Sequence, residues 1–279
     1  MIILRQKLFN DNPPVKKITD PVRRSLIKKS LETTKGSGNE DLSRKVIEEF
    51  KKVPNYKNAV SEIRVDPNKI KPGQGVFGGN LTKRQIDRIK KGKPVNIGNK
   101  KVILDPELLK DPDWVSGTVK LNNLKDTSTL AHELGHAERA ARGSLFNDLQ
   151  RKLRGSKLQK NIGAIGLASG FASGYNQTKN DDNSTIKKVG AYVPVVAINA
   201  PVLIEEADAS RRGLRLMKNA GASKTQLGRS RKSLAYALGS YAIRPAAQIA
   251  MTGVGRVAGK VAGRLSKKNN NENTTTKRI

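Results

Sequence analysis

The chain has 279 residues, of which 54 are Lys or Arg and 24 are Asp or Glu, giving a formal net charge of +30. It contains two histidines, no cysteine and only 4% aromatic residues. The absence of cysteine excludes a disulfide framework, a thiolate zinc site, an iron–sulfur cluster and a cysteine nucleophile. Any bound metal must therefore be held by histidine and carboxylate side chains.

The basic charge is concentrated toward the ends of the chain. Residues 101–150 hold six basic and eight acidic residues, whereas residues 211–279 hold sixteen basic residues and one acid, Glu272. A surplus of this size attracts nucleic acid, anionic lipid head groups or acidic protein, and it says nothing about the fold. An anionic membrane surface and non-specific nucleic acid are therefore both candidate partners.

The first thirty residues alternate short apolar runs with basic pairs. Pro13, Pro14 and Pro21 lie among them, and this spacing predicts that no long helix forms there. The segment lacks the uninterrupted apolar stretch and small-residue cleavage site of a signal peptide. We therefore expect a membrane-associated or virion-associated protein rather than a secreted one.

The next hundred residues contain three short predicted elements and one turn region. Apolar residues recur at helical spacing over 42–52, which predicts a short amphipathic helix, and residues 81–91 predict another, more basic one. Residues 73–80 are rich in glycine and predict a turn region. Residues 102–104 are apolar and bounded by turn signals, which predicts a short edge strand.

Two uncharged stretches follow, over 161–178 and 189–204. A bilayer span needs about 20 mainly apolar residues, so both stretches fit either two buried core helices or a short membrane-associated pair. Residues 234–265 are rich in Ala and Gly and predict a further helix, whereas the Asn, Thr and Lys of residues 266–279 predict a disordered tail.

The most specific feature of the sequence is the pattern H-E-x-x-H, formed by His132, Glu133 and His136. On a helix, a separation of four residues places both imidazoles on one face, where they can bind one Zn²⁺. Glu133 is then placed to take a proton from a metal-activated water, as the general base of a metallopeptidase does. The pattern therefore predicts a catalytic zinc site on a helix.

A catalytic zinc requires a third protein ligand, which must be a carboxylate because the chain has no further histidine. The best candidates lie in the segment 201–212, where Glu205, Glu206 and Asp208 begin a helical pattern. An acidic first turn that suits the helix dipole would also explain Glu205 and Glu206. Asp208 and Glu138 are candidates for orienting the histidine rings.

Four segments, in chain order VILDPELL, TSTLAHELGHA, LIEEADASRRGLRLM and SLAYALGSYAI, resemble the neutral zinc metallopeptidases, which are membrane-associated bacterial gluzincins. The resemblance covers roughly residues 100–250. It implies that Glu206 completes the zinc site, with Glu205 as the fallback. Related peptidases that carry E-x-x-x-D would need an acid at the position of Ile204, so the chain departs from that pattern. The opening MIILRQKLF is similar to the starts of some tailed-phage virion proteins, which implies a phage-encoded member.

These observations together predict a mainly α (α+β) fold with a zincin-like core, an active-site helix, a small edge strand or sheet and basic helical extensions. We expect a basic N-terminal region over 1–95, the metallopeptidase domain over 96–250, and a basic helix end with a disordered tail over 251–279. The predicted edge strand at 102–104 could hold an extended peptide by strand addition.

The predicted function is zinc-dependent hydrolysis of peptide bonds in a protein or peptide substrate, with His132, His136 and Glu206 as zinc ligands and Glu133 as the general base. The alternative is a non-catalytic basic protein of a virion, a nucleic acid or a membrane, whose metal site is structural or vestigial.

Overall fold

The computed structural model describes residues 13–54, 60–71, 73–78, 81, 83–97, 100–110, 117–142, 157–180 and 184–276. In chain order its elements are α2 (Pro13–Thr34), α3 (Glu40–Lys51), β1 (Val60–Val65), β2 (Gly75–Gly78), α5 (Lys83–Lys90), β3 (Val95–Ile97), β4 (Lys100–Val102), the 3-10 helix η1 (Pro106–Lys110), β5 (Gly117–Leu121), α7 (Thr127–Arg142), α9 (Lys157–Lys179), α10 (Thr185–Gly190), α11 (Val193–Asn219) and α12 (Lys224–Thr276). The described chain is mostly helical with two small sheets, which confirms the predicted mainly α class.

The chain forms two compact units that interleave along the sequence. Among the described residues, unit 1 contains those within 25–142 and 204–239, and unit 2 contains those within 13–24, 157–203 and 240–276. Helices α2, α11 and α12 each contribute residues to both units. The predicted boundaries at residues 95 and 250 stay predictions.

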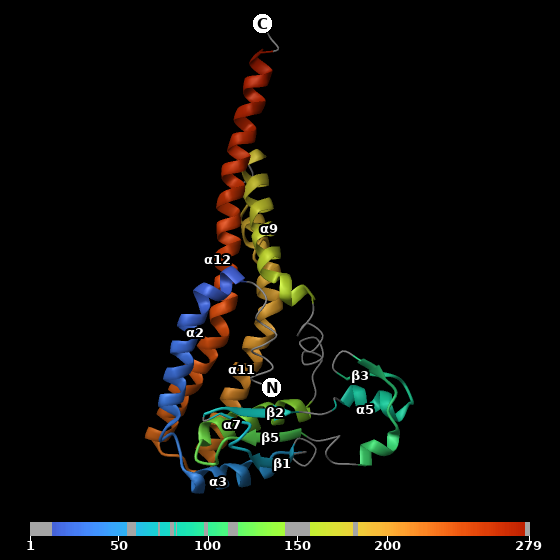
Figure 1. Cartoon of the computed structure of the whole chain (residues 1–279), viewed down its shortest axis with the longest axis vertical. Helices are drawn as coiled ribbons and strands as arrows, with labels where there is room; N and C mark the ends of the chain where they lie inside the picture. The colour runs from blue at the N-terminus through green and yellow to red at the C-terminus, as the bar shows by residue number, and fades with distance from the viewer. Residues whose placement is uncertain are drawn as a thin grey trace. The chain divides into compact units, whose positions relative to one another are not determined.

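A three-stranded sheet in unit 1 has the order β1-β5-β2 (Figure 1). The central strand β5 buries alternate residues, Gly117, Val119 and Leu121, as expected for a strand with one face against a core. Strand β1 pairs with β5 in parallel, and β2 pairs with β5 antiparallel, with Phe77 opposite Val119. Strand β2 therefore forms one edge of this sheet.

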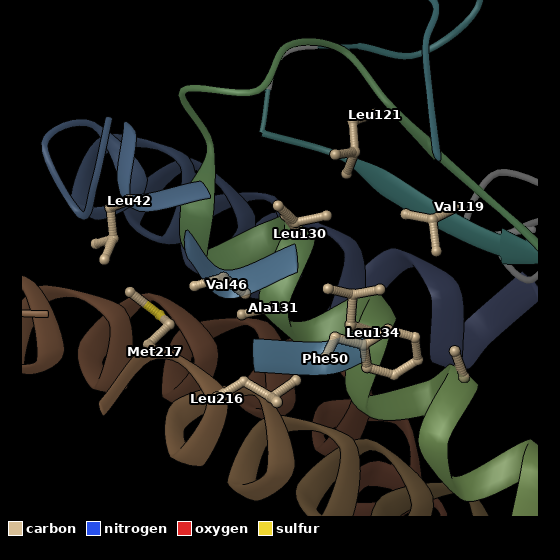
Figure 2. Close-up of a cluster of buried hydrophobic side chains, with 11 residues drawn as sticks. Leu42, Val46, Phe50, Val119, Leu121, Leu130, Ala131, Leu134, Leu216 and Met217 are labelled. Carbon is tan, nitrogen blue, oxygen red and sulfur yellow. The ribbon is translucent and has the colours of Figure 1, made fainter. Parts of the chain in front are cut away.

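The core of unit 1 lies where α3, α7, the end of α11 and β5 meet (Figure 2). The side chain of Asn39 accepts a hydrogen bond from Leu42 N at 2.8 Å and caps α3. The buried residues of this cluster are Leu42, Val46, Phe50, Val119, Leu121, Leu130, Ala131, Leu134, Ala137, Leu216 and Met217. The apolar face of α7 thus packs into the core, and this packing fixes the orientation of its remaining faces.

The expectation that prolines prevent a long N-terminal helix was wrong. Helix α2 spans Pro13–Thr34, with Pro21 in its interior. Pro13 and Pro14 occupy the first turn, where backbone N–H groups have no partner within the helix, so these two residues are compatible with it.

Two predictions about strands also require correction. The glycine-rich residues 73–80, expected to form a turn region, contain strand β2, whose Val76 and Phe77 pair with β5. Only Val102 of the predicted edge strand 102–104 lies in a strand, β4, and β4 pairs with β3 in a separate two-stranded sheet. The residues predicted to hold an extended peptide are therefore absent from the sheet beside α7.

The predicted helices over 42–52, 81–91 and 234–265 correspond to α3, α5 and part of α12. The uncharged stretches 161–178 and 189–204 lie in helices α9 and α11, with α10 ending at Gly190. Among the described residues, no helix combines the length and apolar character that a bilayer span requires. The disordered tail predicted from residue 266 was wrong as far as Thr276, because α12 continues to that residue and no Gly or Pro interrupts it after Leu265.

Candidate metal centre

Helix α7 carries the H-E-x-x-H pattern, and its first turn is anchored in unit 1. Thr127 and Ser128 are buried at its start, where Ser43 Oγ and Thr127 Oγ1 lie 2.7 Å apart and Ser37 Oγ donates to Ser128 Oγ at 3.1 Å. Leu130 and Leu134 then bury the core-facing side of the helix. His132 and His136 therefore occupy a different face of the same helix, one turn apart.

Glycines bring α7 and α11 into close contact beside the two histidines. A Cβ atom added at Gly135 would lie 2.2 Å from the backbone oxygen of Ala209, and one added at Gly213 would lie 2.6 Å from that of Ala131. Both distances are shorter than any side chain tolerates. The glycine between the two histidines is therefore needed for the approach of α11.

Three ligand atoms converge where these helices meet. His132 Nε2 lies 3.1 Å from His136 Nε2 and 3.3 Å from Glu206 Oε2, and His136 Nε2 lies 3.4 Å from the same carboxylate oxygen. Tetrahedral ligands at about 2.0–2.1 Å from a zinc ion lie about 3.3–3.4 Å from one another. The triangle of donor atoms thus has the size of one face of a zinc coordination tetrahedron.

The chemistry of this donor set also fits zinc. Catalytic zinc sites can have two imidazoles and one carboxylate as protein ligands, with the fourth position left to water. The side chains of Glu206 and His132 are 1% and 12% exposed, so the group lies in a buried setting. These residues can hold a metal ion.

The hydrogen bonds of Ser210 favour one tautomer of His132. With its hydroxyl proton donated to the backbone oxygen of Glu206 at 2.8 Å, the oxygen of Ser210 is placed to accept from His132 Nδ1–H, 3.1 Å away. A proton on Nδ1 leaves the lone pair on Nε2, the atom that faces the other two ligands. Ser210 therefore prepares His132 to bind a metal.

The two adjacent glutamates of α11 have different positions. Glu206 points its Oε2 at both Nε2 atoms, whereas Glu205 Oε1 lies 3.5 Å from His136 Nδ1, on the opposite side of that ring. Helix α11 begins at Val193, so the helix dipole at a first turn does not explain these acids. The geometry places Glu206 among the ligand atoms and Glu205 behind His136.

Glu133 lies against strand β2. Phe77 N donates to Glu133 Oε2 at 2.7 Å, and Glu133 is almost fully buried. A Cβ atom added at Gly75 would lie 2.7 Å from Glu133 Cγ, so glycine at this position is what lets the strand approach the carboxylate. The edge strand and the predicted general base are therefore in direct contact.

Glu138 has a structural role in the described residues instead of orienting a histidine. Its fully buried carboxylate accepts from Arg212 Nη1 at 2.6 Å and from Arg215 Nη2 at 2.8 Å on both oxygens. These bonds connect the end of α7 to α11. They help to fix the relative position of the two helices that carry the ligands.

Asp208 was also expected to orient a histidine ring, and it too pairs with arginines. Arg212 Nε and Arg211 Nη2 donate to its two oxygens at 2.8 and 2.9 Å, and Arg139 Nη1 lies 3.6 Å away. Burial raises the pKa of Asp208, but the hydrogen bonds from Arg212 and Arg211 and the charges of Arg212 and Arg139 outweigh burial and hold this pKa below its ordinary value of 3.8. In the described residues, Ser210 and Glu205 are the groups that face the histidine Nδ1 atoms.

Between His136 and Glu205 the sequence holds three further acids besides Glu138. Asp148, Asp181 and Asp182 lie outside the described residues. Sequence reasoning did not identify Ser210 or the backbone N–H of Phe77. Ser210 could have been found, because it lies four residues after Glu206 and thus on the same face of α11.

We expect Ser210→Ala to lower the affinity for Zn²⁺ about 10- to 100-fold, because His132 would lose the acceptor that favours the Nδ1–H tautomer. The affinity is measured by competition with a chromogenic chelator. Ser210→Thr keeps the hydroxyl group and should retain most of the affinity. Equal affinities for Ser210→Ala and the wild type would show that this hydrogen bond does not prepare the site.

Comparison of the chain with known protein families, with curated proteins and with solved structures found no match.

Proposed function

We propose that the chain is a zinc-dependent metallopeptidase. The observation that carries the proposal is the convergence of His132 Nε2, His136 Nε2 and Glu206 Oε2 at separations of 3.1–3.4 Å, with Glu133 on the same helix. A structural zinc site is usually closed by four protein ligands, whereas three ligands and an adjacent carboxylate are typical of hydrolytic sites.

A zinc ion bound here would polarise the scissile carbonyl and lower the pKa of a water molecule. Glu133 accepts the proton of the attacking water and passes it to the leaving amine. The hydrogen bond from Phe77 N holds one oxygen of this carboxylate in place and leaves the second oxygen for proton transfer. Burial of Glu133 excludes bulk water from that step.

Strand β2 supplies a surface for an extended peptide. Among the described strands it pairs only with β5, and Phe77 N faces away from β5 toward Glu133. A peptide added alongside β2 by strand addition would therefore pass next to the general base. In this proposal β2 takes the role that the sequence suggested for residues 102–104.

The proposal is tested by measuring the metal content and peptidase activity of the purified full chain. We expect about one zinc per chain and hydrolysis of unfolded casein or of a mixed peptide library. Hydrolysis should be lost when a chelator removes the metal and should recover when zinc is added back. His136→Ala and Glu206→Gln should both lose zinc. Glu205→Gln is the matched control, because it makes the same chemical change at the next residue and should keep zinc near stoichiometry.

Two outcomes would contradict the proposal. A wild-type chain that contains no metal and binds none would leave a basic binding protein with a vestigial site. A zinc-loaded chain that cleaves no peptide in the library would favour a structural role for the metal. Circular dichroism of each variant shows whether a lost metal reflects a lost ligand or a lost fold.

A further inference from the structure

Helices α9 and α12 lie side by side in unit 2 and approach each other through glycines (Figure 1). A Cβ atom added at Gly170 or Gly174 would lie 2.1 or 2.0 Å from a backbone oxygen of α12. A Cβ atom added at Gly255 or Gly259 would lie 2.2 or 2.0 Å from a backbone oxygen of α9. No side chain larger than that of glycine fits at these four positions, where the two backbones approach each other.

Many bulky apolar residues of unit 2 are exposed. Of the fifteen large hydrophobic side chains that are exposed in the described residues, three lie in unit 1 and twelve in unit 2. The twelve are Val22, Leu167, Phe171, Ile186, Val189, Val193, Val196, Ile249, Val254, Val257, Val261 and Leu265. Exposed hydrophobic residues that cluster in this way mark interaction surfaces.

The interior of unit 2 combines a small apolar cluster, formed by Ile162, Val195 and Ile198, with buried polar side chains. Asn199 and Gln248 are buried and hydrogen-bonded to each other at 3.0 Å, and buried Thr252 donates to the backbone oxygen of Gln248 at 3.0 Å. Unit 2 thus buries glycines, amides and a small apolar cluster, while twelve of its bulky apolar side chains stay exposed. An exposed set of this size, rather than a single exposed residue, is the informative feature.

The exposed residues of α12 form one continuous stripe. Val254, Val257, Val261 and Leu265 are 64%, 64%, 53% and 59% exposed. At 3.6 residues per turn they fall within an arc of about 80° of the helix circumference. We call these four residues the α12 stripe. It lies on the side of the helix opposite the glycines that contact α9.

Around the stripe, the described residues 157–180, 184–203 and 240–268 carry only basic charges, because they contain no Asp or Glu. The acid that α12 does contain, Glu272, lies about two turns beyond Leu265. Lys260 and Arg264 lie on the helix face adjacent to the stripe, and neither forms an ion pair with a described residue. A second copy of this chain would bring two positive surfaces together, whereas an anionic lipid surface complements both the charge and the apolar side chains.

We propose that the α12 stripe, together with Lys260 and Arg264, binds the surface of a membrane that contains anionic phospholipid. The valines and the leucine enter the boundary between head groups and acyl chains, and the two cations lie among the phosphates. The stripe belongs to unit 2, whereas the metal ligands all belong to unit 1. The proposal therefore stands or falls independently of the metallopeptidase proposal.

The test is co-sedimentation of the full chain with vesicles of phosphatidylcholine alone or mixed with phosphatidylserine. We expect binding only to the mixed vesicles. Val257→Ser with Val261→Ser should weaken it at least about tenfold, and Lys260→Gln with Arg264→Gln about 10- to 30-fold. The matched control is Val65→Ser with Ile103→Ser, which removes two exposed apolar side chains from unit 1 and should leave binding unchanged.

Three results would overturn the inference. The first result is equal binding to neutral and anionic vesicles, or binding to neither, which would contradict recognition of anionic phospholipid. Loss of binding in the cation variant but not in the valine variant shows a purely electrostatic association that does not use the stripe. The third result concerns self-association in sedimentation experiments. If the wild type self-associates while the valine variant is monomeric and still binds vesicles, the stripe is a contact between copies of the chain.

Discussion

Glu133→Gln should lower the kcat for peptide hydrolysis about 10²- to 10⁴-fold while leaving the zinc content unchanged. Glutamine has nearly the size of glutamate, and its side-chain oxygen can still accept the hydrogen bond from Phe77 N. The fold and the position of β2 are therefore retained. What the variant loses is a group that can accept the proton of the attacking water.

The matched control is Glu48→Gln, which makes the same change at an exposed position on α3 and should leave both zinc content and kcat unchanged. Zinc is measured by elemental analysis and hydrolysis by release of a fluorescent peptide product. A zinc-loaded Glu133→Gln variant with wild-type activity would remove Glu133 from the reaction. A variant that also loses its zinc would point to a role in building the site instead.

The three residues on α7 could be predicted from sequence because their geometry is local. Once residues 127–142 form a helix, the spacing of His132 and His136 alone places their rings on one face. The third ligand required more information, since Glu206 belongs to a helix 70 residues farther along the chain. The need for a carboxylate limited the choice to a few acids, and the resemblance to zinc metallopeptidases selected Glu206 over its neighbours.

The features that sequence reasoning missed depend on backbone groups or on tertiary contacts. A backbone N–H such as that of Phe77 is present at every non-proline residue, so nothing in the sequence marks it as a partner of Glu133. Strand β2 was missed because Gly75 and Gly78 suggest a turn, and only pairing with β5 makes the segment a strand. The start of α11 at Val193 was missed as well, which left the helix dipole as an apparent explanation for Glu205 and Glu206.

The arginine contacts of Glu138 show why an acid near a metal site is not necessarily part of it. From sequence, Glu138 is a candidate for orienting a histidine ring. In the fold it lies on another face of α7, toward Arg212 and Arg215 of α11. The sequence gives the spacing of acids and arginines along each helix, but the pairing depends on how the helices pack.

Glu138→Ala should lower the free energy of unfolding of the metal-free chain by about 3–5 kcal/mol, the typical cost of breaking a buried ion pair by removing one partner. The carboxylate is fully buried, and Arg212 is largely buried as well, so water replaces little of what is lost. Arg211→Ala is the control, because Arg211 is exposed and its pairing with Asp208 should contribute less than about 1 kcal/mol. Denaturant unfolding followed by circular dichroism measures both changes.

A second variant separates stability from helix positioning. Replacing Glu138, Arg212 and Arg215 together by methionine removes the charges and fills the space, and such replacements are often neutral or stabilising in other proteins. Suppose that the ion pairs mainly fix the position of α7 against α11. The triple variant should then unfold at nearly the same denaturant concentration as the wild type. It should bind zinc more weakly, because its ligands are less well aligned. Wild-type zinc affinity in the triple variant would show that the contacts through Gly135 and Gly213 are sufficient to align the ligand helices.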